Sequence, residues 1–398
     1  MLHPLEIKPD IYWVGGVDWN ERNFHGYTTD RGSTYNAYLI LDEEITLIDT
    51  AKESFADDLI NRISVLCNPS EIRYIISNHV EQDHSGSLRK LLELAPQARV
   101  IASAPQGVNG LKAHYGSDFN LEGVKTGDTL CIGKRTLEFI QCPMVHWPDN
   151  MTVYSKDDKI LFSNDAFGQH FASSKHFDDE VGLHEVLEQA TKYYANIVMP
   201  YSMQVQRLLK AVQDLDFDMI APAHGVIWRS HVQDIVSKYH SWSNNESEEY
   251  AIVIFDSMWH ATERMAVQIV EAFIEQGITA RLFDLKYDHI SDIMTEVLKA
   301  RYIAVGSPTL NNMMMPTVAA FLTYMRGLAP KKRASLAFGS FGWAPAGPKQ
   351  VYESLEQCGF DMLMPVCSHQ WSAHDDYLAE LQSEVLAALD AYRKRETE

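Results

Sequence analysis

Four side chains that commonly bind metal ions occur within six residues, in the stretch His79-Val-Glu81-Gln-Asp83-His84. The stretch follows an apolar run, 72–77, that predicts a buried strand. If the chain stays extended, His79, Glu81 and Asp83 project to one side, and His84 swings in as a helix begins. Two imidazoles and two carboxylates this close together predict a metal site.

Further donors are expected at the ends of later strands, because four ligands from one loop leave a pair of metal ions incompletely coordinated. His146, Asp165 and His224 each stand where a strand-like run stops. The predicted metal ligands are therefore His79, Glu81, Asp83, His84, His146, Asp165 and His224.

The order of these donors resembles the metallo-β-lactamase superfamily, whose usual first motif is His-x-His-x-Asp-His. Glu81 stands here where a second histidine is usual. Carboxylates mixed with imidazoles favour iron or manganese over zinc. The negative charges of Glu81, Asp83 and Asp165 also stabilise an oxidised metal pair. We therefore expect a site that can cycle between ferrous and ferric ions.

Composition limits the possible partners and location. The 398 residues, 46% of them hydrophobic and 22% charged, can form two or three cores. A formal net charge of −20 argues against nucleic acid or anionic membranes as partners, because polyphosphate surfaces are bound by Lys and Arg. No run approaches the roughly 20 apolar residues of a membrane span. The start lacks the pattern of a secretory signal, so we expect a cytoplasmic protein.

The five cysteines are widely spaced and form no Cys-x-x-Cys pair. They predict reduced thiols and not a disulfide framework. Cysteine-ligated iron modules need clustered thiolates. The chain is therefore expected to carry no rubredoxin-like or ferredoxin-like centre of its own.

A polar stretch at 241–249 separates two patterned regions, so we predict domains at 1–248 and 249–398. After this stretch, strand-like runs alternate with helix-length stretches, which predicts a parallel sheet covered on both faces. The expected strands of the second domain are 250–255, 279–283, 302–305, 334–338 and 362–366.

Three loops of the second domain fall at the ends of expected strands, where doubly wound sheets bind ligands. The first offers a helix N-terminus and the hydroxyls of Ser257 and Thr262, which favours a phosphate. It has neither the Walker nor the dinucleotide glycine pattern. Together the loops resemble those of the flavodoxin family, which hold FMN. The expected FMN contacts are Ser257, Met258, Trp259, His260, Thr262, Ser307, Pro308, Thr309, Leu310, Asn311, Asn312, Ser340, Phe341, Gly342 and Trp343.

The two domain types in this order resemble the layout of the flavodiiron proteins, also called A-type flavoproteins, over nearly the whole chain. The matching stretches are Phe24-His25-Gly26-Tyr27, Tyr35-Asn36-Ala37-Tyr38-Leu39, His146-Trp147-Pro148-Asp149, Ser163-Asn164-Asp165 and Tyr193-Tyr194-Ala195-Asn196-Ile197. The resemblance implies an α/β protein, with a metallo-β-lactamase-like αββα sandwich followed by a flavodoxin-like doubly wound sheet. It also implies an oxidoreductase that passes electrons from FMN to a non-haem di-iron centre. The substrate would be O₂, reduced to water, or NO, reduced to N₂O, or both.

The resemblance also assigns roles and partners. It gives two iron-binding triads and one bridging carboxylate: His79, Glu81 and His146; Asp83, His84 and His224; and Asp165. Some family members leave the residue at the position of His84 off the metal. A head-to-tail homodimer, alone or paired into a tetramer, would set one subunit's FMN beside its partner's irons, with Trp147 a candidate to line that junction. Electrons would come from a separate donor such as rubredoxin or an F420-type donor.

Two other interpretations stay open. A zinc hydrolase fused to a flavodoxin-like domain would cleave an ester or amide with a metal-bound hydroxide, and Glu81 argues against it. A non-catalytic electron carrier would use only the flavodoxin-like part, and the full ligand set argues against that. The choice between O₂ and NO is also left open. Lys52 is expected in solvent, and His25 and His170 are expected at the surface or behind the ligands.

Overall fold

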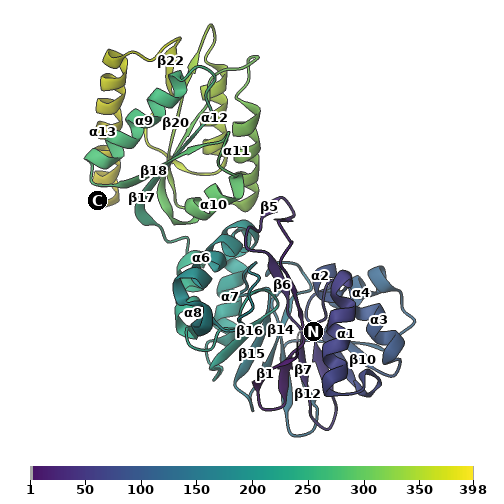
Figure 1. The fold of residues 1–398 in the computed structure, drawn as a ribbon. Coiled ribbons are helices and arrows are strands. Elements are labelled where there is room, and N and C mark those ends of the chain that lie inside the picture. The colour runs from purple at the N-terminus through teal and green to yellow at the C-terminus, as the bar shows by residue number, and fades with distance from the viewer. Residues whose placement is uncertain (1–2, 398) are drawn as a thin grey trace. The chain divides into compact units, whose positions relative to one another are not determined.

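The computed structural model describes residues 3–397. The chain folds into two compact units (Figure 1). Unit 1 comprises residues up to 194 together with 201–243, and unit 2 comprises 195–200 together with the chain from 244 onward. The break after 243 lies inside the polar stretch. The domain boundary that we predict between 248 and 249 falls within strand β17 (Glu248–Phe255), and it stays a prediction.

Unit 1 contains two large sheets, one of seven strands and one of five. In spatial order, the first sheet is β1 (Leu5–Lys8), β2 (Ile11–Trp13), β7 (Tyr38–Ile40), β8 (Thr46–Ile48), β9 (Tyr74–Ser77), β10 (Arg99–Ser103) and β11 (Leu121–Val124). The second is β12 (Thr129–Cys131), β13 (Thr136–Gln141), β14 (Met151–Ser155), β15 (Ile160–Asn164) and β16 (Met219–Pro222). Two short antiparallel pairs lie between β2 and β7 in the chain: β3 (Gly16–Asp18) with β6 (Ser33–Tyr35), and β4 (Asn23–Phe24) with β5 (Tyr27–Thr28).

The two sheets pack face to face, with helices outside them. Because successive strand residues point to opposite faces, Ile76 of β9 joins the core between the sheets with Phe162 of β15, whereas Ile75 joins the core under the outer helices. The first sheet is covered by α1 (Ala56–Leu66), α3 (Leu88–Leu94) and α4 (Gln106–Tyr115). The second sheet has α6 (Leu183–Tyr193), α7 (Ser202–Val212) and α8 (Val232–Ser243) beside it (Figure 1). The expected αββα sandwich is confirmed.

The parallel pairing places the loops that carry candidate metal ligands at the carboxyl edges of the two sheets. β9 runs parallel to β8 and β10, and β15 runs parallel to β16. Carboxyl ends of parallel strands meet at the same edge of a sheet. His79 therefore follows β9 at one such edge, and Asp165 and His224 follow β15 and β16 at another.

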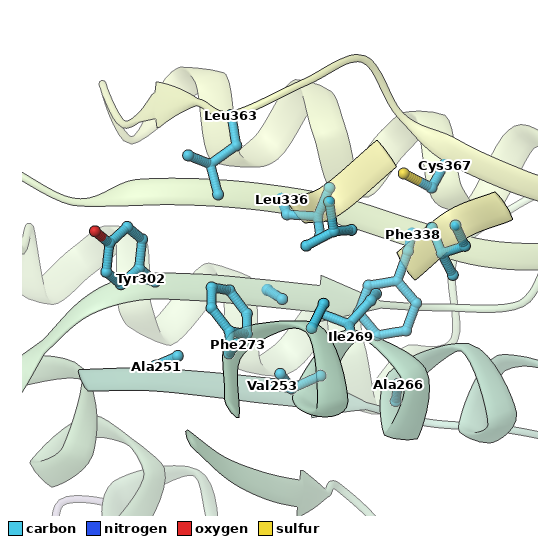
Figure 2. Close-up of a cluster of buried hydrophobic side chains, with 14 of the residues drawn as sticks. Ala251, Val253, Ala266, Ile269, Phe273, Tyr302, Leu336, Phe338, Leu363 and Cys367 are labelled. Carbon is cyan, nitrogen blue, oxygen red and sulfur yellow. The ribbon is translucent and has the colours of Figure 1, made fainter. Parts of the chain in front are cut away.

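Unit 2 is a parallel sheet with helices on both faces. Its order is β18-β17-β19-β20-β21, with β22 also paired to β20. The remaining strands are β18 (Thr279–Asp284), β19 (Ala300–Gly306), β20 (Ala334–Phe341), β21 (Asp361–Met362) and β22 (Cys367–Gln370). The helices are α9 (Ala261–Glu275), α10 (Ile290–Lys299), α11 (Pro316–Leu328), α12 (Ala346–Gln357) and α13 (Asp375–Thr397). Figure 2 shows sheet residues Val253, Leu336 and Phe338 beside Ile269 and Phe273 of α9, all buried. The flavodoxin-like sheet is confirmed.

The last strand of this sheet differs from the expectation. A single strand over 362–366 is wrong, because β21 ends at Met362 and β22 begins at Cys367. Pro365 lies in the gap, and proline has no N–H to donate to a strand ladder. The loop at the carboxyl end of the sheet therefore begins after residue 370.

The helix that follows the metal-binding motif begins earlier than expected. α2 (Gln82–Ser85) contains Asp83, and Glu81 is its N-cap residue. The Ser85 hydroxyl donates to the carbonyls of Val80 and Glu81, which closes this first turn. The extended conformation expected for this stretch is therefore wrong, and Asp83 extends from a helix. Among residues 3–397, each helix is too short or too polar to cross a bilayer.

Candidate metal centre and flavin pocket

The seven predicted metal ligands converge in unit 1. Their donor atoms form three overlapping groups, and within each group all the atoms lie within 4.8 Å of one another. All seven side chains are buried except His146, which is 15% exposed. The groups are His79, Glu81 and His146; Asp83, His84 and His224; and His79, His84 and Asp165.

Two imidazoles are oriented by acceptors behind them. Nδ1 of His79 donates to Oδ2 of Asp149 over 2.9 Å, and the same oxygen accepts from the Val80 amide over 2.8 Å. Nδ1 of His224 donates to the Thr34 carbonyl over 2.7 Å. In both rings Nε2 is left to face the cluster, which is how proteins fix the ligating nitrogen of histidine.

Asp165 lies between the two triads. Its Oδ1 is 3.3 Å from Nε2 of His84, and its Oδ2 is 3.7 Å from Nε2 of His79. From the other side, Oδ1 accepts from the Tyr193 hydroxyl over 3.1 Å and Oδ2 accepts from Nδ2 of Asn150 over 3.2 Å. The two oxygens are thus held toward different histidines. This arrangement suits a carboxylate shared by two metal ions.

Neighbouring charges keep the carboxylates ionised. Burial alone would raise the pKa of Glu81, but hydrogen bonds from His146 and His79 hold the pKa of this carboxyl well below its usual range. Burial would also raise the pKa of Asp165, and His84 lowers it well below the ordinary value. For His79, burial opposes protonation, yet hydrogen bonds to Asp149 and Glu81 raise the pKa to about 9. Ionised carboxylates are the form that binds metal cations.

The surroundings of the Asp83 carboxylate suit the binding of a cation. This side chain is 94% buried, and neither of its carboxylate oxygens has a hydrogen-bond partner among the described residues. A buried carboxylate without such a partner is costly unless a charge compensates it. His224 and His84 have Nε2 atoms 3.3 and 3.5 Å from its oxygens. A metal ion held among these three side chains would complete the coordination of the acid.

A cavity of about 710 Å³ opens onto this cluster. Glu81 and Asp83 form part of its wall, and Trp147 lies at its edge, 38% exposed. Lys52 also lines the cavity, with its side chain 41% exposed and Nζ 3.0 Å from Oε2 of Glu21. The other lining residues are Asn23, Phe24, His25, Glu53, Ser54, Gln82, Gly86, His114 and Tyr115.

The sequence did not single out three groups behind the ligands. Tyr193 and Asn150 bond Asp165, and Asp149 bonds His79. The available signal was that Asp149 and Tyr193 lie in the family-like stretches 146–149 and 193–197. His170 is buried against His224, with ring centroids 4.9 Å apart, as expected for a histidine behind the ligands.

A second cavity, of about 390 Å³, lies in unit 2 at the carboxyl ends of the strands. Predicted FMN contacts that line it are Met258, Trp259, Pro308, Thr309, Leu310, Asn311, Ser340, Phe341, Gly342 and Trp343. Predicted contacts that do not line it are Ser257, His260, Thr262, Ser307 and Asn312 in unit 2, and Trp147 in unit 1. Four residues outside the expected contacts also line it, Ala261, Ala344, Trp371 and Ser372.

The loops around this cavity are tied together. The Thr309 amide donates to the Ser340 carbonyl over 3.0 Å, and the Thr262 and Ser340 hydroxyls lie 3.0 Å apart. Ser257 is buried, and its hydroxyl has no hydrogen-bond partner among residues 3–397. It stands just before α9, where backbone N–H groups attract anions. The unpaired hydroxyl at this position fits a phosphate group.

Comparisons with known proteins agree with both domain types. Residues 34–225 match the model of the ODP family beta lactamase, and residues 253–383 match the flavodoxin model. A nitric oxide reductase of Moorella thermoacetica is 41% identical over 377 residues, which cover 93% of this chain and 94% of the relative.

Solved structures match the fold over its whole length. Rubredoxin oxygen:oxidoreductase from Desulfovibrio gigas gives a TM-score of 0.96 at 36% identity, covering 100% of both chains. The flavodiiron protein from Giardia intestinalis gives 0.95 at 35% identity, covering 99% of this chain and 98% of that one. The names of these relatives support an oxidoreductase over the zinc hydrolase. The chain belongs to the flavodiiron protein family.

Proposed function

We propose that this protein passes electrons from bound FMN to a di-iron centre and there reduces O₂ to water, NO to N₂O, or both. The observation that carries the proposal is the convergence of seven donors, three of them carboxylates, beside a cavity in unit 1. The same chain carries a flavodoxin-type pocket in unit 2, and Ser257, next in the chain to the lining residue Met258, has a buried hydroxyl without a hydrogen-bond partner among the described residues. The relatives named above supply the two candidate gases.

The ligand assignment that we propose follows the donor groups. His79, Glu81 and His146 would hold one iron, Asp83, His84 and His224 the other, and Asp165 would bridge them. The first two sets coincide with two of the three groups. For His84, the support is that its Nε2 lies 3.3 Å from both Nε2 of His224 and Oδ1 of Asp165.

The protein residues prepare this site for redox chemistry. When bound, two ferrous ions supply electrons and neighbouring coordination positions for a diatomic gas. Asp149 and the Thr34 carbonyl hold two imidazoles in the ligating orientation. Tyr193 and Asn150 hold the two oxygens of Asp165. Orientation of this kind preserves the geometry while the charge of the centre changes.

For the flavin, we propose that the phosphate lies at the Ser257 hydroxyl and the start of α9. The isoalloxazine would occupy the cavity bordered by Trp259, Trp343 and Trp371. When bound, FMN takes up and passes on electrons. Apolar walls suit this flat ring system, and the polar backbone of the three loops can orient it.

Exposed aromatic side chains support a head-to-tail homodimer, alone or as half of a tetramer. Trp147 at the metal cavity is 38% exposed, and Trp259 and Trp343 at the flavin cavity are 87% and 79% exposed. Exposed apolar patches commonly mark protein interfaces. One subunit's flavin would face its partner's irons, and rubredoxin or an F420-type donor would supply electrons. A cytoplasmic location stays a prediction.

The first experiment tests the cofactors and the reaction together. Protein loaded with ferrous iron and FMN is reduced without oxygen and then mixed separately with O₂ and NO, while gas consumption and flavin reoxidation are recorded. We expect two irons and one FMN per chain and rapid reoxidation by at least one gas. Preference for zinc, with no consumption of either gas, would overturn the proposal.

A mixing experiment tests the head-to-tail arrangement. His146→Ala removes a proposed iron ligand, and Ser257→Asp places a carboxylate where the phosphate is proposed. Each variant alone should be inactive. In mixed dimers, the intact flavin of one subunit would face the intact irons of the other, so activity should return. Mixed dimers without activity would contradict electron transfer between subunits.

A further inference from the structure

The two carboxylate oxygens of Glu81 have different surroundings. Oε2 lies 3.2 Å from Nε2 of His79 and 3.4 Å from Nε2 of His146, so it faces the proposed iron. Oε1 is 2.9 Å from Nε2 of His25, which donates a hydrogen bond to it. One oxygen is thus directed at the metal cluster, and the other is held by a histidine outside the ligand set.

The chain positions His25 by a tight hairpin. β4 and β5 are joined by the two residues His25 and Gly26, at φ +53° and +86°. Two successive positive φ values are typical of a type I′ turn, which directs the strands of a hairpin into register. The Asn23 side chain accepts from the Gly26 amide over 2.9 Å, and the Phe24 ring lies 4.5 Å from the imidazole of His25. The turn at His25 and Gly26 therefore holds the imidazole of His25 next to the Glu81 carboxylate.

The hydrogen bond lies where the cavity meets solvent. The His25 side chain is 73% exposed, whereas that of Glu81 is 10% exposed. Both residues line the 710 Å³ cavity. Because His25 packs mainly at the surface, replacing it should leave the core of unit 1 unchanged.

We propose that His25 is a positioning residue that keeps Glu81 bound to iron through Oε2 alone. The inference rests on the proposed function, because it requires iron at the cluster. A carboxylate can bind a metal through one oxygen or both, and the second oxygen occupies another coordination position. The His25 hydrogen bond draws Oε1 away from the metal. A coordination position on this iron is thereby kept open toward the cavity, where a small ligand can bind.

Two variants of similar size distinguish the effect of the His25 hydrogen bond from the effect of side-chain volume. His25→Leu removes the donor, whereas His25→Gln keeps an N–H donor on a side chain of comparable reach. Both are compared with wild type as full-length protein loaded with iron and FMN and oxidised. Azide serves as the probe, because it binds an open position on ferric iron and its binding is followed by visible absorption. Crystal structures of the iron-loaded proteins show whether Glu81 binds through one oxygen or both.

We expect His25→Leu to retain its iron and to bind azide about 10- to 100-fold more weakly than wild type, the range typical for residues that support metal ligands. Glu81 should bind through both oxygens in this variant. His25→Gln should restore azide binding and one-oxygen coordination. Equal azide affinity in all three proteins, or an unchanged Glu81 in His25→Leu, would overturn the inference.

The outcome also separates this inference from the proposed function. Wild-type protein that takes up no iron would refute the di-iron proposal and the role of His25 with it. Wild-type protein that holds two irons and reduces a gas, but binds azide no better than His25→Leu, would refute only the role of His25. Iron loss from both variants alike would also count against it, because the Gln variant keeps the donor.

Discussion

Replacing Ser257 by alanine should change flavin binding and protein stability in different directions. The hydroxyl is buried, and it has no hydrogen-bond partner among the described residues. A hydrogen bond to a charged group contributes about 1.5–3 kcal/mol. At about 1.4 kcal/mol per tenfold change, its loss should weaken FMN binding by about 10- to 150-fold. Without flavin, the variant should be as stable as wild type or slightly more stable, because an unpaired buried donor costs about 1–3 kcal/mol.

The assay is a fluorescence titration of flavin-free protein with FMN and, separately, with riboflavin, which lacks the phosphate. Ser257→Ala should lose affinity for FMN only. Ser307→Ala is the matched control, because its hydroxyl accepts from the Met315 amide and donates to the Pro308 carbonyl. That variant should lower the free energy of unfolding by about 1–3 kcal/mol even without flavin. Equal losses of FMN and riboflavin affinity in Ser257→Ala would refute a phosphate contact.

Four further predictions concern the rest of the chain. Asp149→Ala should weaken iron binding by about 10- to 100-fold in a chelator competition, with a smaller loss for Asp149→Asn. Gly225→Ala should lower the free energy of unfolding in urea by about 1–3 kcal/mol, because φ is +81° and the new Cβ would lie 2.6 Å from the Gln169 carbonyl oxygen. Alkylation followed by mass spectrometry should label exposed Cys131 first and the buried Cys142 and Cys367 last, because burial raises the pKa of both thiols, that of Cys367 to about 12. Burial, followed by the nearby His224, lowers the pKa of His170 well below 6.5. The unfolded chain then binds the extra proton, so stability should fall as pH drops below about 6.5, and less steeply in His170→Gln.

The convergence of the proposed metal ligands could be predicted because their positions depend on strand ends. Apolar runs identify buried strands, and a polar residue just after such a run lies at an edge of the sheet. Asp165 follows β15 directly, and His224 follows β16 after one residue. Tyr193 follows no strand-like run, and its one signal was its place in the family-like stretch 193–197. It is the last residue of α6, and only the packing of that helix brings its hydroxyl to Asp165.

The flavin pocket shows how one misplaced strand hides a site residue. A last strand at 362–366 would end five residues before Trp371, so this expectation predicts no pocket loop at that residue. The structure places β22 at Cys367–Gln370, so Trp371 begins the fourth loop at the carboxyl edge. Its amide donates to the Phe341 carbonyl over 2.8 Å, and it lines the pocket beside Trp343. Run length and hydrophobicity could not show that the sheet is interrupted near Pro365.

The proposed metal centre depends on the core of the sandwich as much as on its candidate ligands. His79 follows β9 of the first sheet, whereas Asp165 and His224 follow strands of the second. The donors can meet only if the two sheets keep their spacing, and the core that includes Ile76 and Phe162 sets that spacing. Hydrophobic packing is close and resists small displacements. The donors are thus brought together by apolar contacts that form without them, which is why a cluster with three carboxylates can be assembled despite its own repulsion.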